Sequence, residues 1–212
     1  MLESNNTGIV LQRLTAGILY QPVNLERQAL ANFYAQASTT FDFGVFNLLP
    51  DGGRMAVGQD DLIIQPTRTQ VNMAIPAPFE AVAQRAMAQF DAVRQFLRLQ
   101  QFNAFGVKLI GVFPLGEPSP DYLENRLIRR DNPLDRLGLG RVGTGFRFHF
   151  EREGIWDVRI EPLFSDLSQI FIDVDAQKTE PFRDLRDAHT WMEGVERYIQ
   201  REVVDFLRNL PA

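Results

Sequence analysis

The sequence predicts an α+β protein in which one antiparallel sheet is covered on one side by long helices. Three observations favour this class. Short apolar or alternating segments are separated by turn sequences, two long segments have amphipathic helical spacing, and the same order of elements occurs twice. The chain has 212 residues, 45% of them hydrophobic, which is enough to bury a sizeable core.

The first half of the chain begins with a strand over residues 9–20. This segment is apolar at most positions of both alternating sets, so we expect a central strand covered on two sides. Pro22 ends it, and an amphipathic helix follows over residues 25–34. Turns such as Pro50-Asp51-Gly52-Gly53 then separate four short segments, which predicts an antiparallel meander. Its strands are expected at residues 41–49, 54–57, 62–65 and 70–75, and a long helix at residues 79–101.

The second half repeats this order. A strand over residues 105–115 is followed by a short helix from Asp121 to Arg129 or Arg130. Asn132-Pro133 ends this helix, and a glycine-containing loop leads to a second meander and a last long helix. The strands of the meander are expected at residues 145–152, 156–163 and 169–174, and the helix at residues 181–210.

This repetition predicts two pseudo-symmetric β-α-β(3–4)-α halves, residues 1–101 and 102–212. The two long helices also begin alike, with Pro78-Phe79 in the first half and Pro181-Phe182 in the second. We expect the halves to form one continuous unit with a shared antiparallel sheet and with both long helices on the same face.

The tandem order of elements resembles the saddle-shaped fold of the TATA-box-binding protein, and the likeness covers nearly the whole chain. The late segment Ile170-Phe171-Ile172-Asp173-Val174-Asp175, followed by a helix that carries His189, also looks like a sporadically distributed bacterial family of unknown function. The first resemblance implies helices on the convex side of a curved sheet. The second implies no activity.

Composition excludes several kinds of site. The chain has no cysteine, so a disulfide framework, a thiolate nucleophile and a Cys-ligated metal are all excluded. With two histidines, a metal site would depend on carboxylates and would favour magnesium, calcium or manganese. We expect no cofactor. We also expect no membrane partner, because no apolar run is long enough to span a bilayer. The amino terminus does not resemble a secretory signal, so we expect a cytoplasmic protein.

Polar side chains gather on one face of the second predicted meander. Phenylalanines alternate there with polar residues, and the next two strands alternate in the same way. The candidate polar sheet face contains Arg147, His149, Glu151, Asp157, Arg159, Glu161, Asp173 and Asp175. Paired acids on neighbouring strands are able to bind a divalent cation or to perform acid–base chemistry. A solvated or subunit-covered face with cross-strand ion pairs is the interpretation that we favour.

A second candidate is an arginine-rich stretch around Gly138-Leu139-Gly140. It contains Arg126, Arg129, Arg130, Arg136 and Arg141, which are suited to phosphate or a nucleic-acid backbone. The stretch lacks the ending of a P-loop, and interleaved acids cancel much of its charge. A solvated loop with local ion pairs is therefore favoured over an anion site.

These observations favour a non-enzymatic binding or protein-interaction module that acts through its open sheet face, with self-association or a protein partner. The alternative is a metal-dependent or nucleotide-handling enzyme that uses Asp173, Asp175, Glu161 and His149. A third hypothesis is nucleic-acid binding through the loop between Arg126 and Arg141, although the net charge of −5 disfavours it.

Overall fold

A computed structural model describes residues 8–128 and 143–211 and has an α+β fold. The first half contains β1 (Val10–Leu19), α1 (Arg27–Phe41), β2 (Val45–Leu49), β3 (Gly52–Val57), β4 (Asp60–Gln65), β5 (Arg68–Ala74) and α2 (Phe79–Leu97). The second half contains β6 (Ala104–Pro114), α3 (Ser119–Leu127), β7 (Phe146–Glu151), β8 (Ile155–Pro162) and β9 (Gln169–Lys178). The chain ends in one continuous helix built from α4 (Leu185–Tyr198), the π-helical segment η2 (Ile199–Val203) and α5 (Val204–Arg208).

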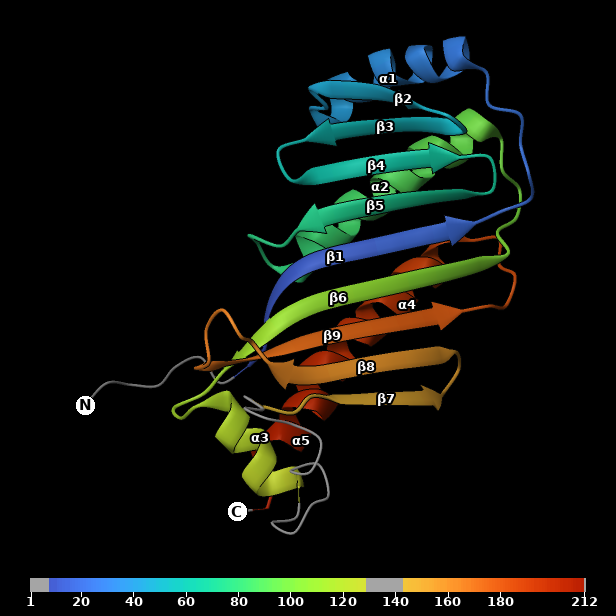
Figure 1. The fold of residues 1–212 in the computed structure, drawn as a ribbon. Coiled ribbons are helices and arrows are strands. Elements are labelled where there is room, and N and C mark those ends of the chain that lie inside the picture. The colour runs from blue at the N-terminus through green and yellow to red at the C-terminus, as the bar shows by residue number, and fades with distance from the viewer. Residues whose placement is uncertain (1–7, 129–142, 212) are drawn as a thin grey trace.

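The nine strands of the described residues form one open antiparallel sheet in the order β2-β3-β4-β5-β1-β6-β9-β8-β7. The first strands of the two halves, β1 and β6, therefore pair at the centre. Each also pairs with the last strand of its own half, β5 or β9. Helices α2 and α4 lie behind the sheet in Figure 1, and the face toward the viewer carries no helix. The predicted class, with a single shared antiparallel sheet, is confirmed.

The core lies between the sheet and the helices. Alternate residues of the central strands point toward α2 and α4 and are almost fully buried, for example Leu14, Ile18 and Leu109. The helices pack against these strand residues with apolar residues at helical spacing, such as Phe90 on α2 and Met192 on α4. The intervening residues of each strand are left for the opposite side of the sheet.

The prediction that β1 is covered on two sides is wrong. Leu14, Ala16 and Ile18 are buried, but Arg13 is exposed, and Thr15 and Gly17 are half-buried. The segment looked apolar on both faces because small residues occupy the second face and because the register of β1 against β6 shifts between Leu11 and Arg13. Such a bulge interrupts the two-residue alternation on which the prediction relied.

Several element boundaries also differ from the prediction, for example the end of the first helix, which is at Phe41 rather than at residue 34. The strand expected over residues 41–49 begins only at Val45, because α1 continues through Ala37 and Phe41 and buries both on its apolar face. The last helix begins at Leu185 rather than at residue 181. Phe182 instead forms an isolated antiparallel bridge with Phe102, and the side chain of Asp184 caps the helix by accepting a hydrogen bond from the Arg186 amide.

Within the parts of the chain that the structure describes, no helix is both long enough and apolar enough to cross a membrane.

Candidate functional site

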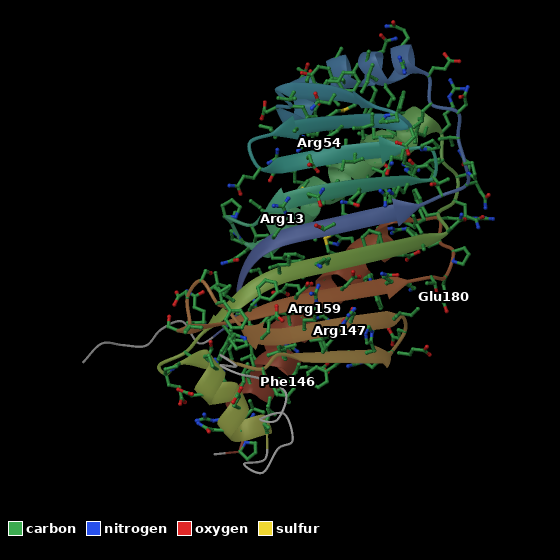
Figure 2. All side chains as sticks on the ribbon, in the orientation of Figure 1. Arg13, Arg54, Phe146, Arg147, Arg159 and Glu180 are labelled. Atoms are coloured by element: carbon green, nitrogen blue, oxygen red, sulfur yellow. The ribbon has the colours of Figure 1, made fainter. Side chains whose placement is uncertain are left out.

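The open face, meaning the side of the sheet away from α2 and α4, carries the polar side chains of the strands. Figure 2 shows Arg54, Arg13, Arg159 and Arg147 distributed over it, from β3 in the first half to β7 at the opposite edge. The candidate residues of β7, β8 and β9 therefore belong to a larger polar surface that also includes the first half of the chain.

Asp173 is the most buried carboxylate of this face, with 3% of its surface exposed. It sits on β9 between two cations from the neighbouring strands. Lys108 of β6 places Nζ 2.9 Å from Asp173 Oδ2, and Arg159 of β8 donates from Nη2 to the same oxygen at 2.6 Å. Because a buried carboxylate is costly without compensating charge, these two cations make its position in the sheet tenable.

Asp157 on β8 is held by Arg147 on the edge strand. The Arg147 Nε lies 2.9 and 3.1 Å from the two carboxylate oxygens, and Nη2 donates as well. The hydrogen bonds from Arg147 hold the pKa of Asp157 below its usual value, and they raise the pKa of Arg147 in turn. His149, directly opposite Asp157 in the register, approaches the same carboxylate at 3.9 Å.

The remaining candidates of the polar sheet face do not join this arrangement. Asp175 accepts a 3.3 Å hydrogen bond from the Gln177 amide, Glu161 lies opposite Phe171, and Glu151 is exposed at the end of β7. Among the described residues, no group of three or more His, Asp or Glu side chains is arranged to hold a metal ion. The candidate acids are spread along the sheet, and two of them, Asp157 and Asp173, are paired with cations.

Of the arginine-rich stretch, the structure describes only Arg126. Its guanidinium lies 3.0 Å from Glu117 and 4.1 Å from the centre of the Tyr122 ring, so it is engaged within its own helix region. Arg129, Arg130, Arg136 and Arg141 lie outside the described residues.

The first half contributes a polar chain that sequence reasoning missed. Asp61 on β4 accepts hydrogen bonds from Arg54 of β3 at 2.8 Å and from Asn72 of β5 at 2.6 Å. Thr15 of β1 in turn donates to Asn72 at 2.8 Å. A sequence pattern in β1 could have indicated this side of the sheet. Polar or small residues alternate there with apolar ones, namely Arg13, Thr15 and Gly17 with the buried Leu14, Ala16 and Ile18.

A shallow hollow of about 300 Å³ lies on the central strands of the open face, toward the end that contains Leu19 and Ala104. Gly17 of β1 and Gly106 of β6 are directly opposite each other in the central ladder, and both line it. The neighbouring positions in the same row are Gln70 of β5 and Gln177 of β9. Leu19, Arg68 and Lys108 are also part of its wall.

The packing and backbone conformation around Gly17 and Gly106 do not require glycine at either position. A Cβ at Gly17 would approach no atom nearer than the Thr69 carbonyl oxygen at 3.6 Å, and one at Gly106 would meet only Gln177 Cγ at 3.8 Å. These are ordinary van der Waals contacts, and neither residue has a positive φ. Glycine in a strand interior also weakens the strand, so its place here calls for another reason.

Comparison with known proteins adds no family: no protein-family model matches the chain, and no curated protein is significantly similar to it.

Proposed function

We propose that the protein is a non-enzymatic binding module whose open sheet face receives a segment of a protein partner. The observation that carries the proposal is the Gly17–Gly106 pair at the centre of that face. Two glycines that the chain's own packing does not need lower the surface where an outside group is able to approach the backbone.

The wall of the hollow fits a peptide better than a charged ligand. The amides of Gln70 and Gln177 offer both hydrogen-bond donors and acceptors, which is what a partner backbone requires. Leu19 adds an exposed apolar contact. Lys108 faces the hollow, but its charge is already partnered by Asp173. Arg68 and Asp175 of the same lining carry opposite charges. The surface of the hollow is therefore close to neutral, which supports a protein partner over nucleic acid.

The carboxylates of the face support a structural role for its charges. Asp173, Asp157 and Asp61 each bind an arginine or lysine of a neighbouring strand. A general base or a metal ligand needs a carboxylate oxygen that is free to receive a proton or a cation. Cross-strand cations neutralise these carboxylates inside the sheet, and among the described residues no three acids or histidines are arranged to hold a metal ion.

We further propose that residues 1–101 and 102–212 are pseudo-symmetric halves of one unit, as in the saddle of the TATA-box-binding protein. Two registers support this. The central pair Leu14–Leu109 would lie on the approximate two-fold axis, which then exchanges Arg13 with Lys108. The directly opposed polar pair Asp61–Asn72 corresponds to Arg159–Asp173 in the other half.

The chain offers a direct test of where a partner binds, because its only lysines are Lys108 and Lys178. Lys108 lines the hollow, whereas Lys178 packs its ammonium over the Trp191 ring, 5.9 Å from the centroid, by the side that α4 covers. The experiment is native mass spectrometry of the protein purified from its own host, followed by amine-reactive cross-linking of the complex.

The proposal expects a protein partner that cross-links to Lys108 and that is lost from the Gly106→Val variant. Gly44→Val is the matched control, because a Cβ at Gly44 meets no atom within 4 Å and Gly44 is not among the residues that line the hollow. A partner that survives Gly106→Val, or that cross-links only to Lys178, would contradict the proposal. A retained metal or nucleotide would favour the enzyme hypothesis instead.

A further inference from the structure

The edge strand β7 has one strand neighbour in the described part of the chain. It pairs with β8, and no described strand pairs with its outer side. On the other side of the molecule, four strands follow β1 outward, the last being β2, whereas only three follow β6. The position that β2 occupies in the first half thus has no counterpart beside β7 among the described residues (Figure 1).

An apolar groove of about 290 Å³ accompanies this edge on the helix side of the sheet. It lies between β7 and the last helix, where Phe148 meets Phe206 edge to face at 6.0 Å between ring centroids. These two rings remain 39% and 37% exposed. At the opposite edge of the sheet, Phe46 of the edge strand β2 stacks on Tyr34 of α1 at 5.0 Å and is partly buried.

We propose that β7 of a second copy of this chain occupies the free position, antiparallel to β7 and with His149 opposite His149 of the second copy. The two sheets then form one continuous sheet, and the two grooves join across the two-fold axis. Edge strands with unpaired backbone groups are the surfaces through which sheets extend in this way.

The alternation of β7 restricts the register. Residues directly opposite each other in an antiparallel pair point to the same side of the sheet, so each phenylalanine must face another even-numbered position. A register centred on Phe148 would set Arg147 against His149 of the second copy. One centred on Phe150 would pair only three residues of the strand.

The register centred on His149 is charge-complementary. It sets Arg147 opposite Glu151 of the second copy, and Phe148 opposite Phe150. Both pairs occur twice because of the two-fold axis, and five consecutive residues are paired. Glu151 is exposed, and no ion pair holds its carboxylate within the described residues. Opposite charges and aromatic pairs at directly facing positions both favour strand pairing.

This dimer leaves the hollow at Gly17 and Gly106 free, since β7 is three strands away from β6. The inference does not rest on the proposed function, and its test uses no other protein. The two proposals can be distinguished by experiment. Dimerisation without a partner would support the dimer alone, and binding of a partner by the monomer would support the proposed function alone.

The absence of cysteine makes the register directly measurable. In the proposed dimer the Cα atoms at position 149 lie about 5 Å apart, within the range that a disulfide bridges. The His149→Cys variant should therefore form a covalent dimer rapidly under mild oxidation. The full chain is used at micromolar concentration, and the product is read by non-reducing electrophoresis and mass spectrometry.

Glu151→Cys is the matched control. It changes another exposed residue of the same strand and the same face, but in the proposed register the two copies of residue 151 are about 13 Å apart. We expect at least tenfold slower cross-linking of this variant, because a disulfide cannot span that distance. Equal rates for the two variants, or a His149→Cys variant that stays monomeric, would overturn the proposal.

A second measurement tests the charge pairing without a cysteine. Sedimentation equilibrium should show a reversible dimer of the unmodified protein. Glu151→Lys sets two like-charged pairs across the interface and should raise the dimer dissociation constant about tenfold at low salt. An unmodified protein that remains a strict monomer, or a Glu151→Lys variant with an unchanged dissociation constant, would also overturn it.

Discussion

The carboxylate of Asp173 and the guanidinium of Arg159 face each other on adjacent strands, 2.6 Å apart, and Lys108 completes the arrangement from the other side at 2.9 Å. Both cations bind the same oxygen, and both are only partly buried. The three side chains therefore tie β6, β9 and β8 together on the open face. Their energetic importance follows from the burial of the carboxylate between them.

Replacing Asp173 by Ala should destabilise the fold by about 2 kcal/mol, because two neighbouring cations lose their partner in a partly desolvated position. Urea unfolding followed by tryptophan fluorescence measures this change. Asp175→Ala is the control: its carboxylate accepts one hydrogen bond from Gln177, and the expected loss is below about 0.5 kcal/mol. Equal losses for the two variants would contradict the central role of Asp173.

Gly106→Val should leave the free energy of unfolding unchanged or raise it by up to about 1 kcal/mol. A Cβ at residue 106 meets only Gln177 Cγ at an ordinary distance, and valine is a better strand residue than glycine. Thermal unfolding checks this outcome. Gly111→Val is the contrasting variant, since a Cβ there would lie 2.8 Å from the Val10 carbonyl oxygen and should be strongly destabilising.

Gln89 on α2 is fully buried, and neither polar atom of its side chain has a hydrogen-bond partner within the described structure. Gln89→Met keeps the length of the side chain and removes both unsatisfied groups, so we expect about 1–2 kcal/mol of added stability. Gln84→Met on the exposed side of the same helix should change stability by less than about 0.5 kcal/mol. A loss of stability in Gln89→Met would show that the amide is needed.

Tyr20 should make the stability of the fold depend on pH in the alkaline range, in contrast to a Tyr20→Phe variant. Burial raises the pKa of its hydroxyl to about 12, although the hydrogen bond with Thr69 opposes the shift. The folded tyrosine stays protonated while the unfolded one ionises near pH 10, so its contribution is complete below pH 10 and is lost between pH 10 and 12. The difference in free energy of unfolding between the unmodified protein and Tyr20→Phe should therefore fall by about 2–3 kcal/mol across that window. Urea unfolding of both proteins at pH 9, 10, 11 and 12 measures this change, and a constant difference in stability between them would contradict the prediction.

One continuous unit should unfold in one step. The β1–β6 ladder joins the two halves through nine residue pairs, and the buried residues of both form a single core. Calorimetry should give equal calorimetric and van't Hoff enthalpies. Two resolved transitions would instead assign independent stability to residues 1–101 and 102–212.

The sequence predicted the second half of the open face well because its alternation is regular. Phe146, Phe148 and Phe150 alternate with polar residues, and directly opposed strands carry the same pattern. The first half was harder because Thr15 and Gly17 are small and because a bulge precedes Arg13. Lys108 was missed for a different reason. It is a single charged residue in an otherwise apolar strand, so it forms no alternating pattern that would place it on the polar face.

Strand order and side-chain partners were beyond the sequence. The pairing of β1 with β6 joins residues about 90 positions apart, and no local pattern encodes it. Asp173 was expected on a solvated or subunit-covered face, yet it is almost fully buried, because its exposure depends on Lys108 and Arg159 from two other strands. Propensity and periodicity describe which way a side chain points but not what covers it.

The central position of β1 has a consequence for how the chain is made. Among the described strands it is synthesised first, but its two neighbours begin only at residues 68 and 104. The amino-terminal five strands are able to pair among themselves before β6 exists. We therefore expect a half-built sheet during synthesis, in which the free side of β1 is unpaired until β6 is made, and β7 and β8 connect to the sheet only through β9, the last strand to be synthesised.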